Sequence, residues 1–151
     1  MERERESERS LLVWSEDYRV GVDDIDDQHR ELFNLVNRLR GAVAEGGDGL
    51  RTVFEELERY TFKHFTDEEA LMMASGYPGF VEHARSHARF VEFVARERQK
   101  FLDGTVPGPG MLDFLNEWLV RHIERDDQLA ADFYLDRMPP RSWFDRIFGR
   151  R

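Results

Sequence analysis

Apolar residues recur at intervals of three and four along most of the chain, and this spacing predicts four long helices. In the first helix, Ile25, Leu32 and Val36 fall on one face. That helix is expected to begin at Asp23 or Asp24, because either carboxylate can cap free N–H groups. The expected helices run from residue 23 or 24 to the glycines at 46–47, and over residues 50–75, 80–102 and 111–138.

Helix-breaking residues separate these segments. Gly76 suits the left-handed backbone at a helix end, Pro78 follows it, and residues 105–110 are too rich in proline and glycine to be helical. No stretch alternates with a period of two for long enough to form a strand. Four helices with short connections predict an all-α protein, an antiparallel up-down-up-down four-helix bundle.

The two ends of the chain differ from the helical part. Residues 1–10 are densely charged and are expected to form a disordered tail. Residues 11–22 carry Trp14 and Tyr18 and are expected to form an extended arm across the end of the domain. The expected division is a charged N-terminus over 1–10, a bundle over 11–138 and a C-terminal tail over 139–151.

The C-terminal tail combines arginines with large apolar residues. Trp143, Phe144, Ile147 and Phe148 would lie on one side of a short helix, with arginines of Arg141–Arg151 around it. Such a basic amphipathic helix is suited to an anionic membrane surface or a protein partner. The alternative is that Trp143 and Phe144 pack back on the end of the bundle.

Composition excludes several classes of protein. The 151 residues are 40% hydrophobic, which is enough for the core of one domain. The net charge of −9 gives no basic surface for nucleic acid, and the absence of cysteine excludes disulfides, thiolate metal sites and iron–sulfur clusters. No apolar run has the length of a signal-peptide core or a membrane span, so we expect a soluble, cytoplasmic protein.

All five histidines lie on the apolar faces of the expected helices. They are His29, His64, His83, His87 and His122. A lone histidine there is usually a hydrogen-bonded core residue, but five together favour a buried metal site. His64 and Glu68 are four residues apart, as are His83 and His87, so each pair lies on one helix face within reach of one ion. The other two histidines arrive from the first and fourth helices, whose faces converge on the same interior.

The ligand types narrow the choice of metal. Imidazoles with carboxylates and no sulfur suit iron, zinc, copper or manganese. Five imidazoles and two carboxylates are too many for one tetrahedral zinc ion, so two ions are the simpler interpretation. If both carboxylates and a solvent-derived oxygen bridge two octahedral ions, every coordination position but one is filled. The open position is where a small ligand would bind.

The motifs around these residues resemble those of the hemerythrin family. The matching stretches span most of residues 14–135, and they are the arm at Trp14 and residues 21–29, 64–68, 83–87 and 118–127. The family binds dioxygen at a non-haem centre of two iron ions. The resemblance therefore implies a di-iron centre in this chain, with dioxygen as the ligand.

Seven residues match the family's iron ligands. The resemblance implies that the six-coordinate iron is held by His83, His87 and His122. It implies that the iron with the open position is held by His29 and His64. The bridges between the two ions would be Glu68, Asp127 and a solvent-derived oxo or hydroxo group.

One of these ligands departs from regular helix geometry. Asp127 lies five residues after His122, about 140° around an ideal helix, whereas Asp126 at four residues lies on the same face. The resemblance favours Asp127, which requires a local loosening such as a π-type turn, and Asp126 stays the alternative. The oxygen pocket is expected to be apolar and lined by Leu119, Phe65 and Ile123.

The function that the resemblance implies is reversible dioxygen binding for storage, delivery or sensing. Ferritin-like oxidative sites use Glu-x-x-His motifs. None of the five histidines here has a glutamate three residues before it, which favours a binding protein over an oxidase. The alternative is a di-iron enzyme on the same scaffold, either a peroxidase or a protein that handles nitric oxide.

Overall fold

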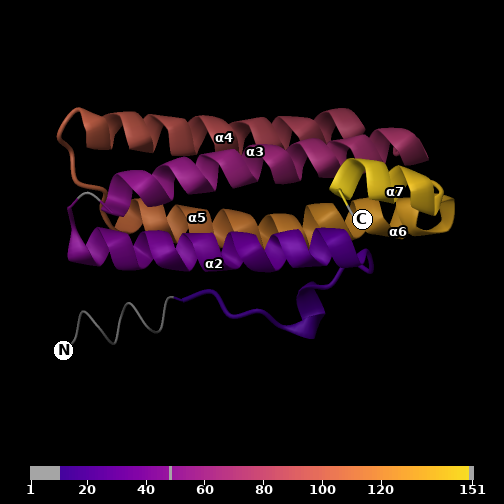
Figure 1. The fold of residues 1–151 in the computed structure, drawn as a ribbon, viewed down its shortest axis with the longest axis horizontal. Coiled ribbons are helices and arrows are strands. Elements are labelled where there is room, and N and C mark those ends of the chain that lie inside the picture. The colour runs from indigo at the N-terminus through magenta and orange to yellow at the C-terminus, as the bar shows by residue number, and fades with distance from the viewer. Residues whose placement is uncertain (1–10, 48, 150–151) are drawn as a thin grey trace.

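The computed structural model describes residues 11–47 and 49–149, which are mostly helical. Four long helical segments run alternately in opposite directions (Figure 1), which confirms the expected antiparallel bundle. The elements in chain order are η1 (Glu16–Tyr18), α2 (Asp23–Glu45), α3 (Gly49–Ser75), α4 (Phe80–Leu102), α5 (Pro109–Arg121), η2 (His122–Asp127), α6 (Gln128–Tyr134), η3 (Leu135–Arg137) and α7 (Arg141–Phe148).

The start of α2 is stabilised differently from what the sequence suggests. The helix begins at Asp23 as expected, but its N-cap is Val22, so the expected capping by Asp23 or Asp24 is wrong. Asp26 is buried instead, and its carboxylate accepts hydrogen bonds from the backbone N–H of Val20 at 2.8 Å and of Gly21 at 3.4 Å. A carboxylate in the first turn thereby fixes the angle at which the preceding chain enters the helix.

The N-terminal arm follows the side of α2 and does not cross the end of the bundle. Figure 1 shows it beneath α2. The backbone N–H and C=O of Leu12 are both hydrogen-bonded to the side-chain amide of Asn37, each at 2.8 Å. The rings of Trp14 and Tyr18 pack on Phe33, with centroids 5.5 and 5.2 Å from it. The expected course across the end is wrong, because these contacts hold the arm along the helix.

The turn between α3 and α4 sends the chain back antiparallel. Gly76 has a φ of 74°, as expected for the residue after a helix end. Its N–H donates to the carbonyl of Met73 at 3.2 Å, and the N–H of Tyr77 donates to the carbonyl of Met72 at 2.9 Å. Together these two bonds form a Schellman motif, which ends α3 and brings α4 alongside it.

The fourth helical segment is interrupted. One helix with a local loosening beside Asp127 is expected over residues 111–138, and the segment consists of α5, the π-helical turn η2, α6 and the 3-10 turn η3. It also begins earlier, at Pro109, since a proline in the first helical turn lacks only an N–H that would be unpaired there. The interruption covers His122 to Asp127, where the family resemblance requires a loosened turn.

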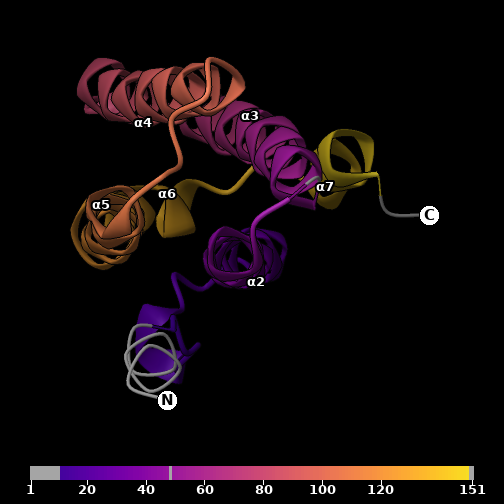
Figure 2. The ribbon, with the colours of Figure 1, turned by 90° about the vertical axis from the view of Figure 1, so that its left-hand side faces the viewer.

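The interior holds two separate apolar clusters. Figure 2 shows the four helical segments around this interior. Members of the larger cluster include Leu32, Phe65 and Ile123, and members of the smaller one include Ile25, Leu71 and Ala130. On α2, α3 and the fourth segment, the stretches between the two clusters carry His29, Glu68 and Asp127, all buried. The polar centre of the bundle therefore lies between two apolar layers.

The tail packs against the bundle. Trp143, Phe144 and Phe148 of α7 contact the smaller apolar cluster. The alternative in which the aromatic residues pack back is therefore the arrangement in the structure. Arg141 and Arg146 are exposed, and a membrane or protein partner for the tail stays a prediction. Arg150, Arg151 and the expected disorder of residues 1–10 lie outside the described residues. None of the helices formed by the described residues is long and apolar enough to cross a membrane.

Candidate metal centre

All four helical segments send ligand-type side chains into the polar centre. Every one of the seven residues singled out from the sequence lies there, and none is more than 5% exposed. They come from α2 (His29), α3 (His64, Glu68), α4 (His83, His87) and η2 (His122, Asp127). The convergence that was expected from helical spacing is therefore present, and it forms two overlapping groups.

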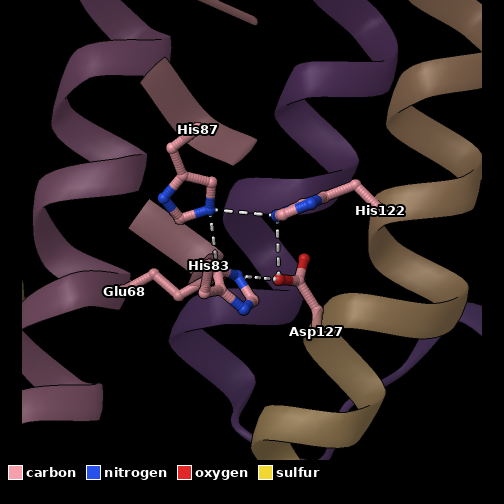
Figure 3. Close-up of side chains that lie close together, drawn as sticks. All are labelled: Glu68, His83, His87, His122 and Asp127. Atoms are coloured by element: carbon pink, nitrogen blue, oxygen red, sulfur yellow. Dashed lines mark hydrogen bonds and ion pairs between the residues drawn. The ribbon is translucent and has the colours of Figure 1, made fainter. Parts of the chain in front are cut away.

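The three-histidine group consists of His83, His87, His122, Glu68 and Asp127 (Figure 3). Nε2 of His83 lies 2.7 Å from Oε1 of Glu68 and 2.9 Å from Oδ1 of Asp127. Nε2 of His87 lies 3.2 Å from the same Glu68 oxygen, and Nε2 of His122 lies 3.2 Å from the same Asp127 oxygen. The ligand atoms all lie within 4.8 Å of one another, so a single ion can contact them all.

The two-histidine group consists of His29, His64, Glu68 and Asp127. Nε2 of His29 lies 3.0 Å from Oδ2 of Asp127 and 3.5 Å from Oε2 of Glu68. Nε2 of His64 lies 3.3 Å from the same Glu68 oxygen. This group has fewer protein ligands than the three-histidine group and is the more deeply buried, with His29 at 0% and His64 at 1% exposure.

Glu68 and Asp127 belong to both groups, and each turns one oxygen toward each group. Oε1 of Glu68 faces His83 and His87, whereas Oε2 faces the two-histidine group. Oδ1 of Asp127 faces the three-histidine group, and Oδ2 faces His29. Carboxylates in this arrangement are placed to bridge two ions.

Several buried atoms of the cluster have no hydrogen-bond partner among residues 11–47 and 49–149. They are Nε2 of His29, Oε2 of Glu68 and both carboxylate oxygens of Asp127. Each has a neighbour within 3.5 Å, but the groups are not aligned as donor and acceptor. Buried polar atoms are normally paired, and an unpaired one is costly. Cations between these atoms would satisfy them, and nitrogen and oxygen donors without sulfur fit iron.

The two shared carboxylates raise the pKa of three histidines. Burial alone would lower the pKa of His29, but the adjacent carboxylates of Asp127 and Glu68 raise it to about 9. Burial likewise opposes protonation of His83 and His122, yet the same carboxylates raise their pKa values to about 10 and about 9. For His64, burial prevails and lowers the pKa. Three imidazoles therefore hold protons at neutral pH that a metal ion must displace.

The histidines in turn keep both carboxylates charged. Burial opposes ionisation of Glu68, but the surrounding histidines hold its pKa well below the usual value. Burial and the charge of Glu68 both oppose ionisation of Asp127, but His122 and His29 lower its pKa all the same. Two negative charges therefore face each other in the interior, which is where a cation is stabilised most.

The π-helical turn gives Asp126 and Asp127 different surroundings. Asp127 is 1% exposed, and its carboxylate approaches Nε2 of His122 from inside the bundle. Asp126 has a side chain 49% exposed, and Oδ2 lies 2.9 Å from Nδ1, on the outer edge of the same ring. The extra residue in the turn lets two consecutive acids hold one imidazole from both sides. Asp127 is therefore the inner carboxylate, as the resemblance favours, and Asp126 is an outer partner.

Two further outer partners are absent from the sequence-based set. Nδ1 of His87 lies 2.9 Å from Oε2 of Glu69, and Nδ1 of His64 lies 2.6 Å from Oε1 of Gln28. Each partner directly adjoins a ligand-type residue of its own helix, since Glu69 follows Glu68 and Gln28 precedes His29. That adjacency is the only signal in the sequence, and it does not say which histidine each partner reaches.

The expected pocket-lining residues lie in the larger apolar cluster beside the histidines. Leu119, Phe65 and Ile123 are 2%, 4% and 0% exposed. The ring of Phe65 stacks on His87 with centroids 3.8 Å apart and lies 5.6 Å from the ring of His64, so it contacts a histidine of each group. The centre is therefore bordered by apolar side chains on this side, and a dry oxygen pocket stays a prediction.

Known proteins share this sequence pattern. The sequence profile of the hemerythrin HHE cation binding domain matches residues 20–134. Bacteriohemerythrin of Stenotrophomonas maltophilia (strain R551-3) is 38% identical to this chain over 131 residues, covering 82% of this chain and 81% of that protein. Myohemerythrin-1 of Phascolopsis gouldii is 31% identical over 115 residues, covering 76% of this chain and 87% of that protein.

Solved structures share the fold. A crystal structure of wild-type hemerythrin matches this chain with a TM-score of 0.76 at 30% sequence identity. The match covers 82% of this chain and 97% of that one. The four-helix arrangement expected from apolar spacing is thus found in an independently determined protein of similar sequence.

Proposed function

This chain belongs to the hemerythrin family, and from this premise we propose that it binds dioxygen reversibly at a centre of two iron ions, for storage, delivery or sensing. The observation that carries the proposal is the pair of ligand groups that share Glu68 and Asp127. Two ions that shared these carboxylates and one solvent-derived oxygen would have every octahedral position filled but one. The open position would fall to the two-histidine group, where dioxygen would bind.

Each part of the cluster has a role in this proposal. His83, His87 and His122 would hold one ion, His29 and His64 would hold the other, and Glu68, Asp127 and an oxo or hydroxo group would bridge them. Two ferrous ions would supply the electrons that dioxygen takes up on binding and returns on leaving. The charged carboxylates of Glu68 and Asp127 would stabilise the positive charge of the two ions.

The apolar residues would make the binding reversible. Leu119, Phe65 and Ile123 are buried on the side of the centre toward the larger apolar cluster. Water and charged or proton-bearing species are costly to bring into such surroundings. These side chains would therefore keep protons and water away from the bound ligand, which could then leave unchanged.

The test is a measurement of iron and of the response to air. Protein loaded with iron should contain about two iron ions per chain, according to the ligand count. Its visible absorption should change when air replaces argon and should return when argon is restored. A single zinc ion, or no metal after gentle purification, would contradict the di-iron centre. Rapid and irreversible consumption of dioxygen would contradict reversible binding and favour the enzyme alternative.

A further inference from the structure

The outer nitrogens of the histidines, Nδ1, have different partners in the two ligand groups. In the three-histidine group, Nδ1 of His87 faces the carboxylate of Glu69, and Nδ1 of His122 faces the carboxylate of Asp126, both at 2.9 Å. The hydroxyl of Ser86 is also 3.4 Å from Nδ1 of His122. Two of the three imidazoles in this group therefore donate their outer N–H to an acid.

The two-histidine group has a neutral partner instead. Gln28 is buried, and its side-chain NH₂ donates to Asp67 at 2.9 Å, while Asp67 also accepts from Lys63 at 2.7 Å. These contacts fix the amide so that its oxygen faces His64 and accepts the proton of Nδ1. Asp67 therefore reaches His64 only through Gln28, and the charge of Asp67 is balanced by Lys63.

The second imidazole of this group has no acid either. Nδ1 of His29 is buried and has no hydrogen-bond partner within residues 11–47 and 49–149. Among the described residues, the outer nitrogens of the two-histidine group therefore contact no carboxylate. The asymmetry lies in this chain's own side chains and does not depend on a bound metal.

An acid that accepts the outer proton of a ligating imidazole makes the inner nitrogen a stronger electron donor. Its negative charge also favours the more positive state of a nearby ion. We infer that Glu69 and Asp126 are positioning residues that make the iron of the three-histidine group easier to oxidise than the iron of the two-histidine group. This inference rests on the proposed function. The iron with the open position would thus keep its electron longer, which preserves the site that takes dioxygen.

The two acids should differ in the size of their effect. The side chain of Glu69 is 27% exposed and that of Asp126 is 49% exposed. Water and salt screen an exposed charge more strongly than a covered one. Glu69→Gln should therefore change the oxidation of the centre more than Asp126→Asn. Both replacements keep an oxygen that can accept the imidazole proton, so that orientation is retained while charge is removed.

The experiment is a redox titration of the iron-loaded protein under argon. Each ferrous ion gives up one electron to ferricyanide, which becomes ferrocyanide, and the midpoint of each one-electron step is read from visible absorption. In Glu69→Gln, the midpoint potential of the first one-electron step should rise by about 59 mV. At a fixed potential, the ferric-to-ferrous ratio in that step should therefore fall about tenfold. Asp126→Asn should give a smaller rise in the same step.

Glu124→Gln is the matched control, because Glu124 lies in the same π-helical turn as Asp126 but is exposed and, among the described residues, forms no hydrogen bond or ion pair with the five histidines. It should leave both midpoints unchanged. Mössbauer spectra of the one-electron-oxidised protein should place the ferric signal on the six-coordinate iron. A ferric signal on the other iron, or shifts no larger than that of Glu124→Gln, would overturn the inference.

The outcomes separate this inference from the proposed function. If the unmodified protein lacks two irons or does not bind dioxygen reversibly, the proposed function fails and this inference fails with it. If the unmodified protein passes those tests and the midpoints do not move, only the inference fails. Should Glu69→Gln lose iron, which elemental analysis reveals, Asp126→Asn carries the decision, because its residue lies at the surface.

Discussion

The two helical segments on either side of the three-histidine group place their ligand-type residues by different means. On α4, His83 and His87 are four residues apart in a regular helix, which brings both rings to the same face. On the fourth segment, His122 and Asp127 are five residues apart, and the π-helical turn η2 brings them together. The regular helix offers one inward position per turn, whereas the π turn accommodates an inner and an outer acid around one ring.

The difference teaches that helical spacing identifies ligands only where the helix is regular. An α-helix turns about 100° per residue, so a partner five residues away should point elsewhere. The inserted residue in η2 cancels this rotation and keeps α6 in phase with α5. His122 therefore has its outer acid, Asp126, on its own segment. His87 of α4 has its outer acid, Glu69, on the neighbouring helix α3. The following changes test this comparison.

The largest effect is expected from removal of the inner acid. Asp127→Ala should reduce iron from about two ions per chain to fewer than one, because it removes both bridging oxygens and takes a buried carboxylate away from three histidines. Elemental analysis of protein loaded with iron under argon measures this. Asp126→Ala is the matched control and should retain most of the iron. The opposite ranking would show that the fourth residue, and not the fifth, supplies the inner ligand.

The sequence predicts the regular parts of this comparison well. Apolar spacing fixes the faces of α2, α3 and α4, and ligand-type residues on those faces must meet in a bundle interior. Residues His64 and Glu68 are an example, since their separation alone places both on one face. Spacing could not identify Asp127, because regular geometry favours Asp126. Only the resemblance to a family pointed to the residue that the structure places inside.

Other features could not be predicted because they depend on single tertiary contacts. The arm lies along α2 through the pairing of Leu12 with Asn37, which leaves no periodic signal. The start of α2 uses Asp26, although Asp23 and Asp24 are nearer the helix end and are better N-cap candidates by position alone. In each case several residues of the right type were available, and packing selected one.

A second test concerns the protonation of the histidines on the two segments. In the metal-free protein, the adjacent carboxylates raise the pKa of His83 on α4 to about 10 and that of His122 on η2 to about 9, against the effect of burial. His29 has a pKa of about 9 for the same reason. All three are protonated at pH 7, so that iron binding should release about three protons from them.

A pH-stat titration with ferrous iron under argon measures this release. The apparent affinity should fall about tenfold for each displaced proton when the pH is lowered by one unit, since each pKa lies above the working range. His64 should add nothing, because burial lowers its pKa and leaves it neutral at pH 7. Release of no protons at pH 7 would mean that the imidazoles are already neutral in the metal-free protein.

A third test makes the fourth segment resemble α4. Deletion of Arg125, an exposed residue of η2, would bring His122 and Asp127 to four positions apart and permit a regular helix. Asp127 should still face inward, but Asp126 should lose its place beside Nδ1 of His122. Iron affinity should therefore fall about tenfold to a hundredfold. The metal-free protein should unfold about 2–4 °C higher, since a rare turn becomes regular.

Calorimetry of the metal-free protein and competition with a chelator measure the two effects of this deletion. The replacement Arg125→Ala is the control, because it removes the same side chain but keeps the length of the turn. It should leave both the unfolding temperature and the iron affinity near those of the unmodified protein. A deletion variant with unaltered iron affinity would show that the π turn is not needed to build the site.

The smallest effect is expected from the residue one turn before each histidine. Three residues before His87, α4 has the half-buried Ala84, whereas α5 has the buried Leu119 three residues before His122. In the proposed function, Leu119 keeps water and protons from the bound ligand. Leu119→Ala makes α5 like α4 at this position and should accelerate loss of the oxygenated absorption band by about threefold, with little change in iron content.

The control for Leu119→Ala is Leu115→Ala, one turn earlier on α5. Leu115 is 1% exposed and belongs to the same apolar cluster, so both replacements create a core cavity and should lower the free energy of unfolding by about 2–5 kcal/mol. Only Leu119 is one turn from His122, so only its removal should shorten the life of the oxygenated protein, followed by stopped-flow absorbance. Equal acceleration in both variants would assign the effect to general loosening of the core. No acceleration in either would leave Phe65 and Ile123 as the side chains that keep the pocket dry.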